Sequence, residues 1–373
     1  MAKKVDLILL GTTGALLIFG ILMLASVSAS FSQEKFGTTY YYLNHQLINI
    51  LIGLILGFLA FKINLNLLKK CLPFLLFGNL TLMLMVFLPG IGISAGGATR
   101  WLNLGFTSIQ PSEFLKLTFI LYLASWLNTR TSYKNKLPKE ERNRNFGQTF
   151  LAFLMVLGII GIFLFLQSDQ STFIIILLVA TILYFVAQAP FWHIIVLILT
   201  STGALALFGS SASYRMKRIL VWLKPETDPM GIGYQIKQAL IAVGSGGIFG
   251  LGLGMSRQKF GFLPASMTDS IFAVLAEETG FLGCLILITL FLIFLWRGFK
   301  IGKNNRDNFL KFTALGITSW ILIQTLINIS SMIGLFPVTG IPLPFFSYGG
   351  SAIITELTGM GILLNISKHT SRL

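Results

Sequence analysis

The stretch "DLILLGTTGALLIFGILMLASVSAS", residues 6–30, decides the class of fold. After its first residue it carries no charge, and it is longer than the roughly 20 residues that an α-helix needs to cross the hydrocarbon of a bilayer. It is too long for a secretory signal and lacks a small-residue cleavage site. We therefore interpret it as a membrane span that stays in the protein.

The composition of the whole chain agrees with this first stretch. Of its 373 residues 54% are hydrophobic and 11% are charged, and the mean hydropathy is +0.80. A soluble domain carries about 25% charged residues. Unpaired strands cannot face lipid, so we expect an all-α integral membrane protein in which residues 1–373 form a single domain. Cys71 and Cys284 both lie in apolar runs and are interpreted as small hydrophobic residues.

Ten apolar runs of suitable length predict ten transmembrane helices. They lie near residues 6–30, 44–61, 71–89, 109–127, 147–166, 171–188, 190–208, 270–296, 309–333 and 344–366. The seventh and eighth runs are separated by a large loop, residues 209–269.

The distribution of lysine and arginine predicts the orientation, because short cytoplasmic loops are enriched in them. Eighteen of the 28 cations fall on the side of the membrane that also holds both termini. The termini are therefore expected in the cytoplasm and the loop 209–269 outside the cytoplasmic membrane. The formal net charge of +15 follows from this topology, so we do not infer a nucleic-acid partner.

Seven of the remaining ten cations lie in the loop 209–269. They could meet anionic lipid headgroups, or they could bind an anionic ligand such as a phosphate or pyrophosphate. The candidates for binding such an anion are Arg215, Arg257 and Lys259 in this loop and Arg100 outside it. The middle of the loop predicts a short helix at the membrane surface with Gln235 and Gln238 near its polar side. The glycine run after it is expected to pack as a re-entering loop rather than to cradle phosphate.

Acidic residues at or near membrane depth are the other candidates, because a charge there usually pairs or serves function. Asp269 opens the eighth run, where it could cap the helix or act as a general base beside a polar cavity. Glu113 and Lys116 are spaced i, i+3 and can form an ion pair on one helix face. Glu277 and Glu278 are expected to bond to neighbouring helices.

Three long stretches carry a resemblance to a known family. "GGATRWLNLGFTSIQPSEFLKL" (residues 96–117), "GYQIKQALIAVGSGGIFGLGLGMSRQKFGFLPASMTDSIFAVLAEETG" (233–280) and "INISSMIGLFPVTGIPLPFFSYGGSA" (327–352) resemble the SEDS family of bacterial shape, elongation, division and sporulation proteins. The resemblance implies a ten-span SEDS-type bundle. It also implies a peptidoglycan glycosyltransferase that polymerises lipid II at the outer face of the cytoplasmic membrane.

The resemblance also implies roles for particular residues. The essential aspartate of the family matches Asp269, which would take the proton of the acceptor sugar's hydroxyl in an inverting transfer, with undecaprenyl pyrophosphate leaving. The acid and the lysine of the "QPSE" motif match Glu113 and Lys116, and the arginine before tryptophan matches Arg100. Cations near Asp269 would lower its pKa. The implied partners are the nascent glycan strand, a class B penicillin-binding transpeptidase, other divisome proteins and membrane lipids.

Two stretches, "YYYLNHQLI" (40–48) and "LPGIGISAGGATRWLNLG" (88–105), look more like the division member, FtsW, than the elongation member, RodA. They favour septal cell-wall synthesis. The alternatives are a RodA-like enzyme of elongation, a transporter that flips lipid II, and a scaffold that recruits a transpeptidase.

The chain departs from the family pattern at several positions. Met267 stands where a histidine is common, Thr99 replaces one arginine, and "QSDQST" (167–172) lacks a proline and a glycine, which puts a tight turn there in doubt. Ser347 could bond to substrate or pack between helices. A divalent cation, Mg or Mn, could help to neutralise the leaving pyrophosphate, but the sequence shows no recognisable cluster of metal ligands.

Overall fold

The computed structural model describes residues 5–95, 98–103, 105, 108–134, 139–188, 190, 192–193, 195–197, 199–200, 203 and 213–370, and it describes their side chains except those of residues 95, 132–134, 139–148 and 213–217. The helices are α1 (Leu7–Phe36), α2 (Tyr41–Lys62), α3 (Leu65–Met85), α4 (Pro111–Lys134), α5 (Lys139–Leu166), α6 (Gln170–Val186), α8 (Ser213–Leu223), η1 (Pro225–Thr227), α9 (Ile232–Ser245), α10 (Ile271–Lys303), α11 (Asn308–Met332) and α12 (Gly350–Ser367).

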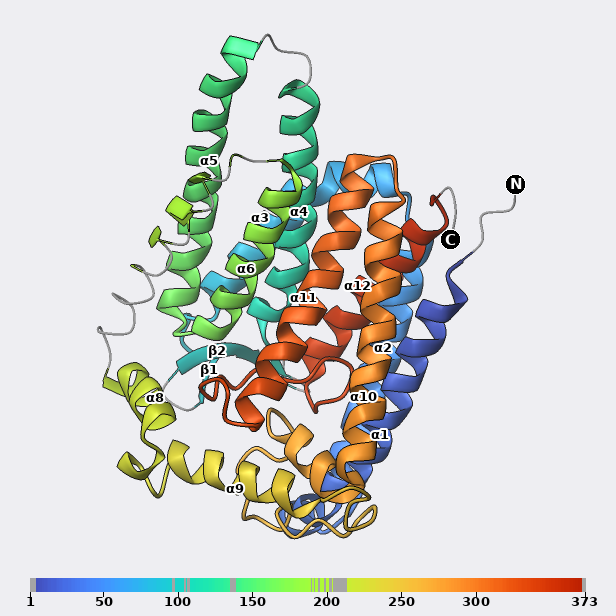
Figure 1. The fold of residues 1–373 in the computed structure, drawn as a ribbon, viewed down its shortest axis with the longest axis vertical. Helices are drawn as coiled ribbons and strands as arrows, with labels where there is room; N and C mark the ends of the chain where they lie inside the picture. Colours follow the sequence, from blue (N-terminus) through green and yellow to red (C-terminus); the bar gives the residue numbers. More distant parts are fainter. Residues whose placement is uncertain are drawn as a thin grey trace.

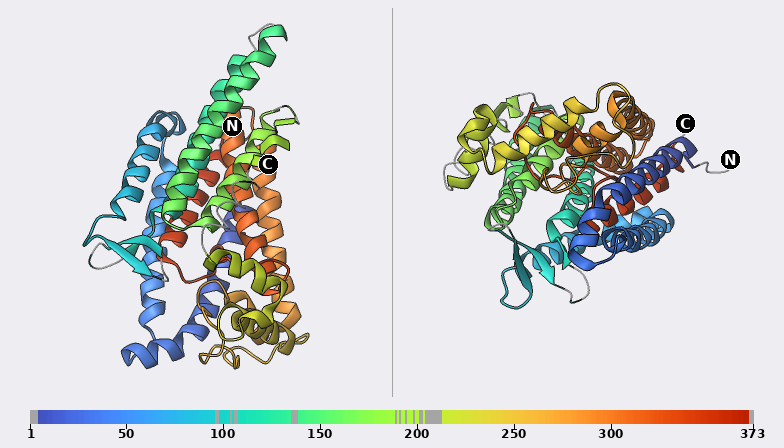
Figure 2. Two further views of the ribbon diagram at one scale, coloured as in Figure 1. Left: turned by 90° about the vertical axis from the view of Figure 1, so that its left-hand side faces the viewer. Right: turned by 90° about the horizontal axis from the view of Figure 1, so that it is seen from below.

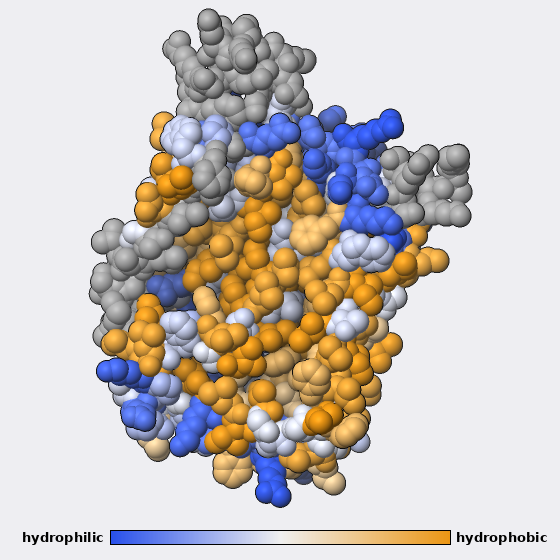
Figure 3. Space-filling model, viewed as in Figure 1, coloured by the Kyte–Doolittle hydropathy of each residue, from blue (hydrophilic) through white to orange (hydrophobic). Residues whose placement is uncertain are grey.

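The long helices run up and down in one bundle, with α11 and α12 near its centre (Figure 1). Most of the residues of α11 and α12 are buried, whereas α1, α2 and α3 expose many apolar side chains. Since lipid is as apolar as these side chains, such exposure is what a bilayer-facing surface requires. The space-filling view shows a hydrophobic band between more hydrophilic ends (Figure 3).

The two ends of the bundle differ. Both termini, the C-terminal end of α4 and the N-terminal end of α5 lie at one end, whereas α8 and α9 lie at the opposite end (Figures 1 and 2). The lysine and arginine count predicts that residues 209–269 and the termini are on opposite sides of the membrane, and the positions of α8 and α9 are compatible with that prediction.

Seven helices of the described residues are long and apolar enough to cross a membrane. They correspond to seven of the predicted runs. The run near 109–127 forms α4, which lies in the bundle but carries more polar residues, and the run near 171–188 forms the shorter helix α6. Most of the run near 190–208 lies outside the described residues.

One predicted boundary was wrong. The run near 344–366 becomes helical only at Gly350, and residues 335–349 are irregular. Pro342 and Pro344 explain the difference, because proline removes a backbone donor and restricts the residue before it to extended conformations. The irregular segment turns into the bundle end, where it borders the candidate site.

A small antiparallel sheet interrupts the all-α pattern between α3 and α4. Strands β1 (Gly92–Ala95), β2 (Ala98–Asn103) and β3 (Ser108–Ile109) pair in the order β1-β2-β3. The sheet projects from the side of the bundle (Figure 2).

The helix α10 is interrupted at Gly280, whose backbone has φ 64° and ψ −162°. This conformation is accessible to glycine and strained for other residues. The carbonyls of Glu277 and Glu278 accept hydrogen bonds from the N–H groups of Leu251 and Gly252, at 2.9 and 3.0 Å. The glycine-rich run thus packs against α10 as a re-entering loop, as predicted.

Candidate functional site

Asp269 lies just before α10, at the end of the bundle that is away from the termini. It is 9% exposed. Thr268 donates a hydrogen bond from Oγ1 to Oδ1 at 2.9 Å, and Gln235 of α9 donates from Nε2 to Oδ2 at 3.3 Å. Among the side chains that the structure describes, both donors to this carboxylate are neutral, and α9 covers it.

Burial raises the pKa of the Asp269 carboxyl above its usual value. The hydrogen bonds from Thr268 and Gln235 and the positive charge of Arg218 act in the opposite direction but do not cancel the effect of burial. The nearby cation thus acts in the expected direction, but burial outweighs it and the net pKa is raised. A carboxylate with a raised pKa is a stronger base, which suits proton abstraction near neutral pH.

The segment before α12 holds the chain around Asp269 in place. Asn328 of α11 donates from Nδ2 to the carbonyls of Asp269 and Ile341, both at 2.8 Å. The hydroxyl of Ser347 donates to the carbonyl of Thr268 and accepts from the N–H of Leu343. Ser347 thus ties two segments together, which is the packing role that the sequence left open.

A polar cavity of about 180 Å³ opens beside this segment. Thr268, the neighbour of Asp269, lines it, and so do Asp169 and three residues singled out in the sequence: Arg100, Glu113 and Lys116. The structure therefore brings residues of β2, α4, the α5–α6 turn and the 209–269 loop to one place.

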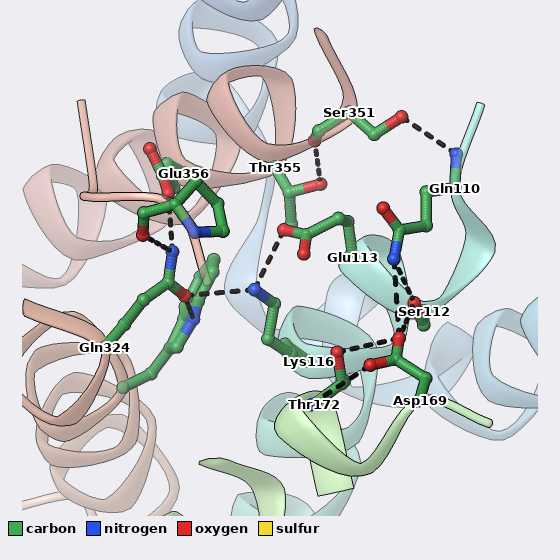
Figure 4. A network of polar contacts seen from close by, with 12 residues as sticks. Gln110, Ser112, Glu113, Lys116, Asp169, Thr172, Gln324, Ser351, Thr355 and Glu356 are labelled. Carbon is green, nitrogen blue, oxygen red and sulfur yellow. Dashed lines mark hydrogen bonds and ion pairs between the residues drawn. The ribbon is translucent and has the colours of Figure 1, made fainter. Parts of the chain in front are cut away.

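The wall of the cavity on α4 contains a buried ion pair. Lys116 Nζ lies 2.8 Å from Glu113 Oε2, and the two residues are 1% and 5% exposed. Lys116 also donates to Gln324 Oε1 at 2.9 Å, and Gln324 Nε2 donates to Glu356 Oε1 at 3.2 Å. Figure 4 shows the four side chains joined in this order across α4, α11 and α12.

Asp169 organises the opposite wall. Its carboxylate caps α6 by accepting from the N–H of Thr172 at 3.3 Å, and it accepts from the hydroxyl of Ser112 at 2.7 Å (Figure 4). The preceding turn forms without proline or glycine because Ser168 adopts φ 57°. Arg100 donates from Nε to Gln167 O at 3.1 Å and from Nη2 to Ser168 O at 2.5 Å, which secures that turn.

Two predicted ligands for an anion lie elsewhere. Lys259 is 4% exposed and its ammonium lies 2.9 Å from Glu278 Oε1, so it pairs with an acid of α10. Arg257 has an exposed side chain, and its backbone N–H donates to Glu277 Oε1 at 3.1 Å. The acids Glu277 and Glu278 therefore bind the loop rather than neighbouring helices alone.

Two further predicted residues do not join the cavity either. Gln238 lines a separate surface groove of about 680 Å³ between η1 and α9. The side chain of Arg215 lies outside the described ones, although its backbone belongs to α8.

Several residues of the site were missed by sequence reasoning. Arg218, Gln324 and Asn328 reach it from α8 and α11. Glu356 of α12 joins them; it is an acid within an apolar run, but its partners come from tertiary contacts that no local pattern identifies. Within the described part of the chain no group of three or more His, Cys, Asp or Glu side chains could hold a metal ion.

Together the fold and the site define a polytopic helical membrane protein that gathers a carboxylate, an ion pair and a polar cavity at one end of its bundle. The sequence profile of the cell cycle protein family FtsW/RodA/SpoVE matches residues 7–372. The chain therefore belongs to this family, the SEDS family.

Relatives and solved structures agree with the assignment over nearly the whole chain. Stage V sporulation protein E of Bacillus subtilis (strain 168) is 39% identical over 98% of this chain and 97% of its own length. A probable peptidoglycan glycosyltransferase FtsW of Coxiella burnetii is 36% identical over 96% of this chain and 95% of its own. Sequence identity thus does not separate the division member from the sporulation member.

Two solved structures share the fold. A chain from work on the structural coordination of polymerization and crosslinking by a peptidoglycan synthase complex superposes with a TM-score of 0.74 at 27% identity, covering 98% of both chains. The rod shape determining protein RodA of Thermus thermophilus gives a TM-score of 0.69 at 25% identity, covering 99% of this chain and 98% of its own.

Proposed function

We propose that this chain is a peptidoglycan glycosyltransferase that polymerises lipid II at the outer face of the cytoplasmic membrane. It crosses the membrane ten times with both termini in the cytoplasm, and residues 209–269 form the extracytoplasmic loop between the seventh and eighth spans. The observation that carries the proposal is Asp269: a buried carboxylate with neutral donors and a raised pKa, one residue from a polar cavity at the end opposite the termini.

In the proposed reaction Asp269 is the general base. It takes the proton of the acceptor sugar's 4-hydroxyl while that oxygen attacks the anomeric carbon of the donor glycan. The bond from that carbon to the lipid pyrophosphate breaks, and the bonding electrons leave with the pyrophosphate. Attack from the face opposite to the leaving group inverts the anomeric centre.

Asn328 and Ser347 are positioning residues in this mechanism, because they hold the backbone of Thr268 and Asp269 rather than the reacting atoms. Gln235 holds one carboxylate oxygen and covers it in this conformation. The cavity of about 180 Å³ is smaller than the ligand pockets of about 300–1,000 Å³ that are usual in proteins. A substrate hydroxyl that reaches Asp269 Oδ2 therefore has to displace the side chain of Gln235 from it.

Negative charge develops on the departing pyrophosphate and needs preorganised cations. Arg218 is the best-placed candidate, because its charge already acts on Asp269. Arg100 and Lys116 also line the cavity, where Glu113 and Asp169 line it with them and Glu113 pairs with Lys116. Arg257 on the exposed part of the loop is available for the first encounter with the lipid headgroup, whereas Lys259 is engaged with Glu278.

For the biological setting we propose septal cell-wall synthesis with a single-span class B penicillin-binding transpeptidase as the partner. The FtsW relatives and the solved peptidoglycan synthase complex support this. Synthesis during sporulation is the second candidate, favoured by the 39% identity to stage V sporulation protein E. Depletion in the source organism distinguishes them: filaments without septa support division, and normal division with defective spores contradicts it.

The enzyme and its rivals are separated by Asp269→Asn. Purified protein, reconstituted in liposomes with lipid II, is assayed for glycan strands and, in parallel, for movement of lipid II across the bilayer. We expect strand formation to fall by about 10²- to 10⁴-fold, the usual contribution of a general base. Glu226→Gln, an exposed acid of the same loop, is the matched control and should polymerise normally.

Unchanged polymerisation in Asp269→Asn would refute the proposed base. Rapid lipid II translocation by the wild-type protein without strand formation would favour a transporter. Absence of both activities in wild-type protein together with its transpeptidase would leave the scaffold as the better hypothesis.

A further inference from the structure

A second concave surface lies far from the cavity, on the lipid-facing side of the bundle. It is a groove of about 530 Å³ between α1, α2 and α12. Its lining on α1 runs from Val5 to Leu17, and its lining on α12 runs from Leu357 to Leu364. The proposed glycosyl transfer makes no use of it, because both termini, and not the Asp269 loop, lie at this end (Figure 1).

The groove is almost purely apolar and open to the outside. Leu7 and Phe58 line it and are 73% and 59% exposed. Gly14 contributes to its hollow shape, because a Cβ there would meet no atom within 4 Å. Gly57 and Gly361 let α2 and α12 approach closely, since a Cβ at either would lie within 2.7 Å of a backbone oxygen of the other helix. In a membrane this surface faces hydrocarbon.

The dimensions of the groove fit one lipid chain. The part of α1 from Leu7 to Leu17 rises roughly 15 Å at 1.5 Å per residue, which is about half the hydrocarbon thickness of about 30 Å. A dry apolar cavity of about 150 Å³ holds one benzene. A groove of 530 Å³ therefore has room for on the order of 20 carbons, which is one acyl chain and too little for a helix with its side chains.

Two cations stand where the groove meets the end with the termini. The ammonium of Lys62 lies 5.5 Å from the ring centre of Phe58, a lining residue. The ammonium of Lys368 lies 3.5 Å from the ring centre of Phe61, also a lining residue, and donates to the Phe61 carbonyl at 2.8 Å. Positive charge at the mouth of a half-bilayer apolar groove complements a phosphate with an attached acyl chain.

We propose that this groove is a binding site for an anionic phospholipid of the leaflet on the side of the termini. One acyl chain lies between α1, α2 and α12, and the phosphate headgroup is held by Lys62 and Lys368. The headgroup therefore sits at the end of the bundle opposite to Asp269, which distinguishes this site from one for the lipid-linked substrate.

The chain offers a matched pair of variants to test the apolar part. A Cβ at Gly14 would meet no atom within 4 Å, and the same is true at Gly11 on the same helix. Gly14 lines the groove and Gly11 does not. Gly14→Leu should therefore fill the groove without disturbing the bundle, and Gly11→Leu should leave it open.

The test uses the full-length protein in detergent, titrated with dioleoyl phosphatidylglycerol or dioleoyl phosphatidylcholine, with bound lipids counted by native mass spectrometry. We expect at least about a fivefold preference for phosphatidylglycerol, corresponding to roughly 1 kcal/mol per surface cation. Gly14→Leu should lose the tightest bound lipid, and Lys62→Gln with Lys368→Gln should abolish the preference. Gly11→Leu and Lys70→Gln, an exposed lysine at the same end, should behave as wild type.

Retention of the tightest phosphatidylglycerol by Gly14→Leu would overturn the proposal, and so would equal binding of the two lipids by the wild-type protein. If Gly14→Leu instead releases a co-purifying single-span protein and leaves the lipid count unchanged, the groove is a helix-docking surface and the proposal is wrong. Thermal melting of each variant shows whether it is folded, so that loss of lipid is not mistaken for unfolding.

Discussion

Asp269 and the pair Glu277 and Glu278 lie within ten residues of each other, yet their surroundings differ. Glu278 accepts from the ammonium of Lys259 and from the hydroxyl of Ser26, and Glu277 accepts from Ser256 and from two backbone N–H groups. Asp269 receives hydrogen bonds from neutral side chains only, among the described residues. The first two acids are bound by the loop, whereas the third has a raised pKa and a cavity beside it.

The difference shows that similar acids in one chain can stabilise the fold at one place and serve proton transfer at another. A carboxylate that is matched by an ammonium is stabilised in its charged form and loses basicity. A carboxylate that is desolvated without such a partner gains basicity but contributes less to folding. The comparison predicts that substitutions at the two places separate activity from stability.

The largest expected effect is on catalysis at Asp269. Asp269→Asn should reduce lipid II polymerisation by about 10²- to 10⁴-fold while the melting temperature in detergent changes little, because the amide still accepts from Thr268. A large drop in melting temperature would instead show that Asp269 stabilises the fold as Glu277 and Glu278 do, and the contrast between the two places would be wrong.

The second effect is on stability at Glu278. Glu278→Gln leaves the buried ammonium of Lys259 unpaired, and removal of one partner of a buried pair costs about 3–5 kcal/mol of folding free energy. The measurement is unfolding of the purified protein, with Glu226→Gln as the exposed control. Lys259→Met combined with Glu278→Met should recover much of the loss. Failure of that double variant to recover would show that the pair does more than hold the loop.

A smaller effect is expected at Arg100. In Arg100→Lys the planar guanidinium that donates to both Gln167 O and Ser168 O is replaced by a single ammonium, which cannot reproduce both hydrogen bonds. The loss of a hydrogen bond from a charged group costs about 1.5–3 kcal/mol of folding free energy. Limited proteolysis near residues 167–169 and thermal melting should both report a looser turn. Arg257→Lys, at an exposed position, is the control. If Arg100→Lys weakens lipid II binding without loosening the turn, Arg100 contacts the substrate.

The smallest effect concerns pH and Gln235. Because burial raises the pKa of Asp269, its base form is present only above that raised value, so the polymerisation rate should fall as the pH drops, starting above the usual carboxyl value of about 4. The hydrogen bond from Gln235 lowers this pKa. Gln235→Ala should therefore move the acid limb of the pH–rate profile to higher pH, and Gln238→Ala, on the same helix, should leave it in place.

A shift of the acid limb to lower pH in Gln235→Ala would contradict the assigned balance between burial and hydrogen bonding. If neither variant shifts the acid limb of the pH–rate profile, the group that titrates there is not Asp269.

Much of the fold could be predicted from the sequence, because apolar length and lysine and arginine counts are local signals. The spacing of Glu113 and Lys116 predicted their ion pair, which the structure confirms at 2.8 Å. The partners of Lys259 and Arg100 could not be predicted, since each reaches across the chain to an element that no periodicity connects to it. For the same reason the sequence placed Lys259 with the anion ligands, and it did not reveal the contact of Gln235 with Asp269.

The interruption of α10 at Gly280 has a mechanical consequence. A Cβ at Gly280 would lie 2.3 Å from the N atom of Gly250, and one at Gly250 would lie 2.3 Å from the carbonyl oxygen of Glu278, so the two backbones are in direct contact. Close backbone contact at these two glycines therefore holds the loop against the helix. Since α10 continues from Gly280 through the bundle to Arg297, whose Nη2 lies 2.7 Å from Asp6 Oδ2 just before α1, this helix connects the glycine-rich loop with the start of α1 at the other end of the bundle.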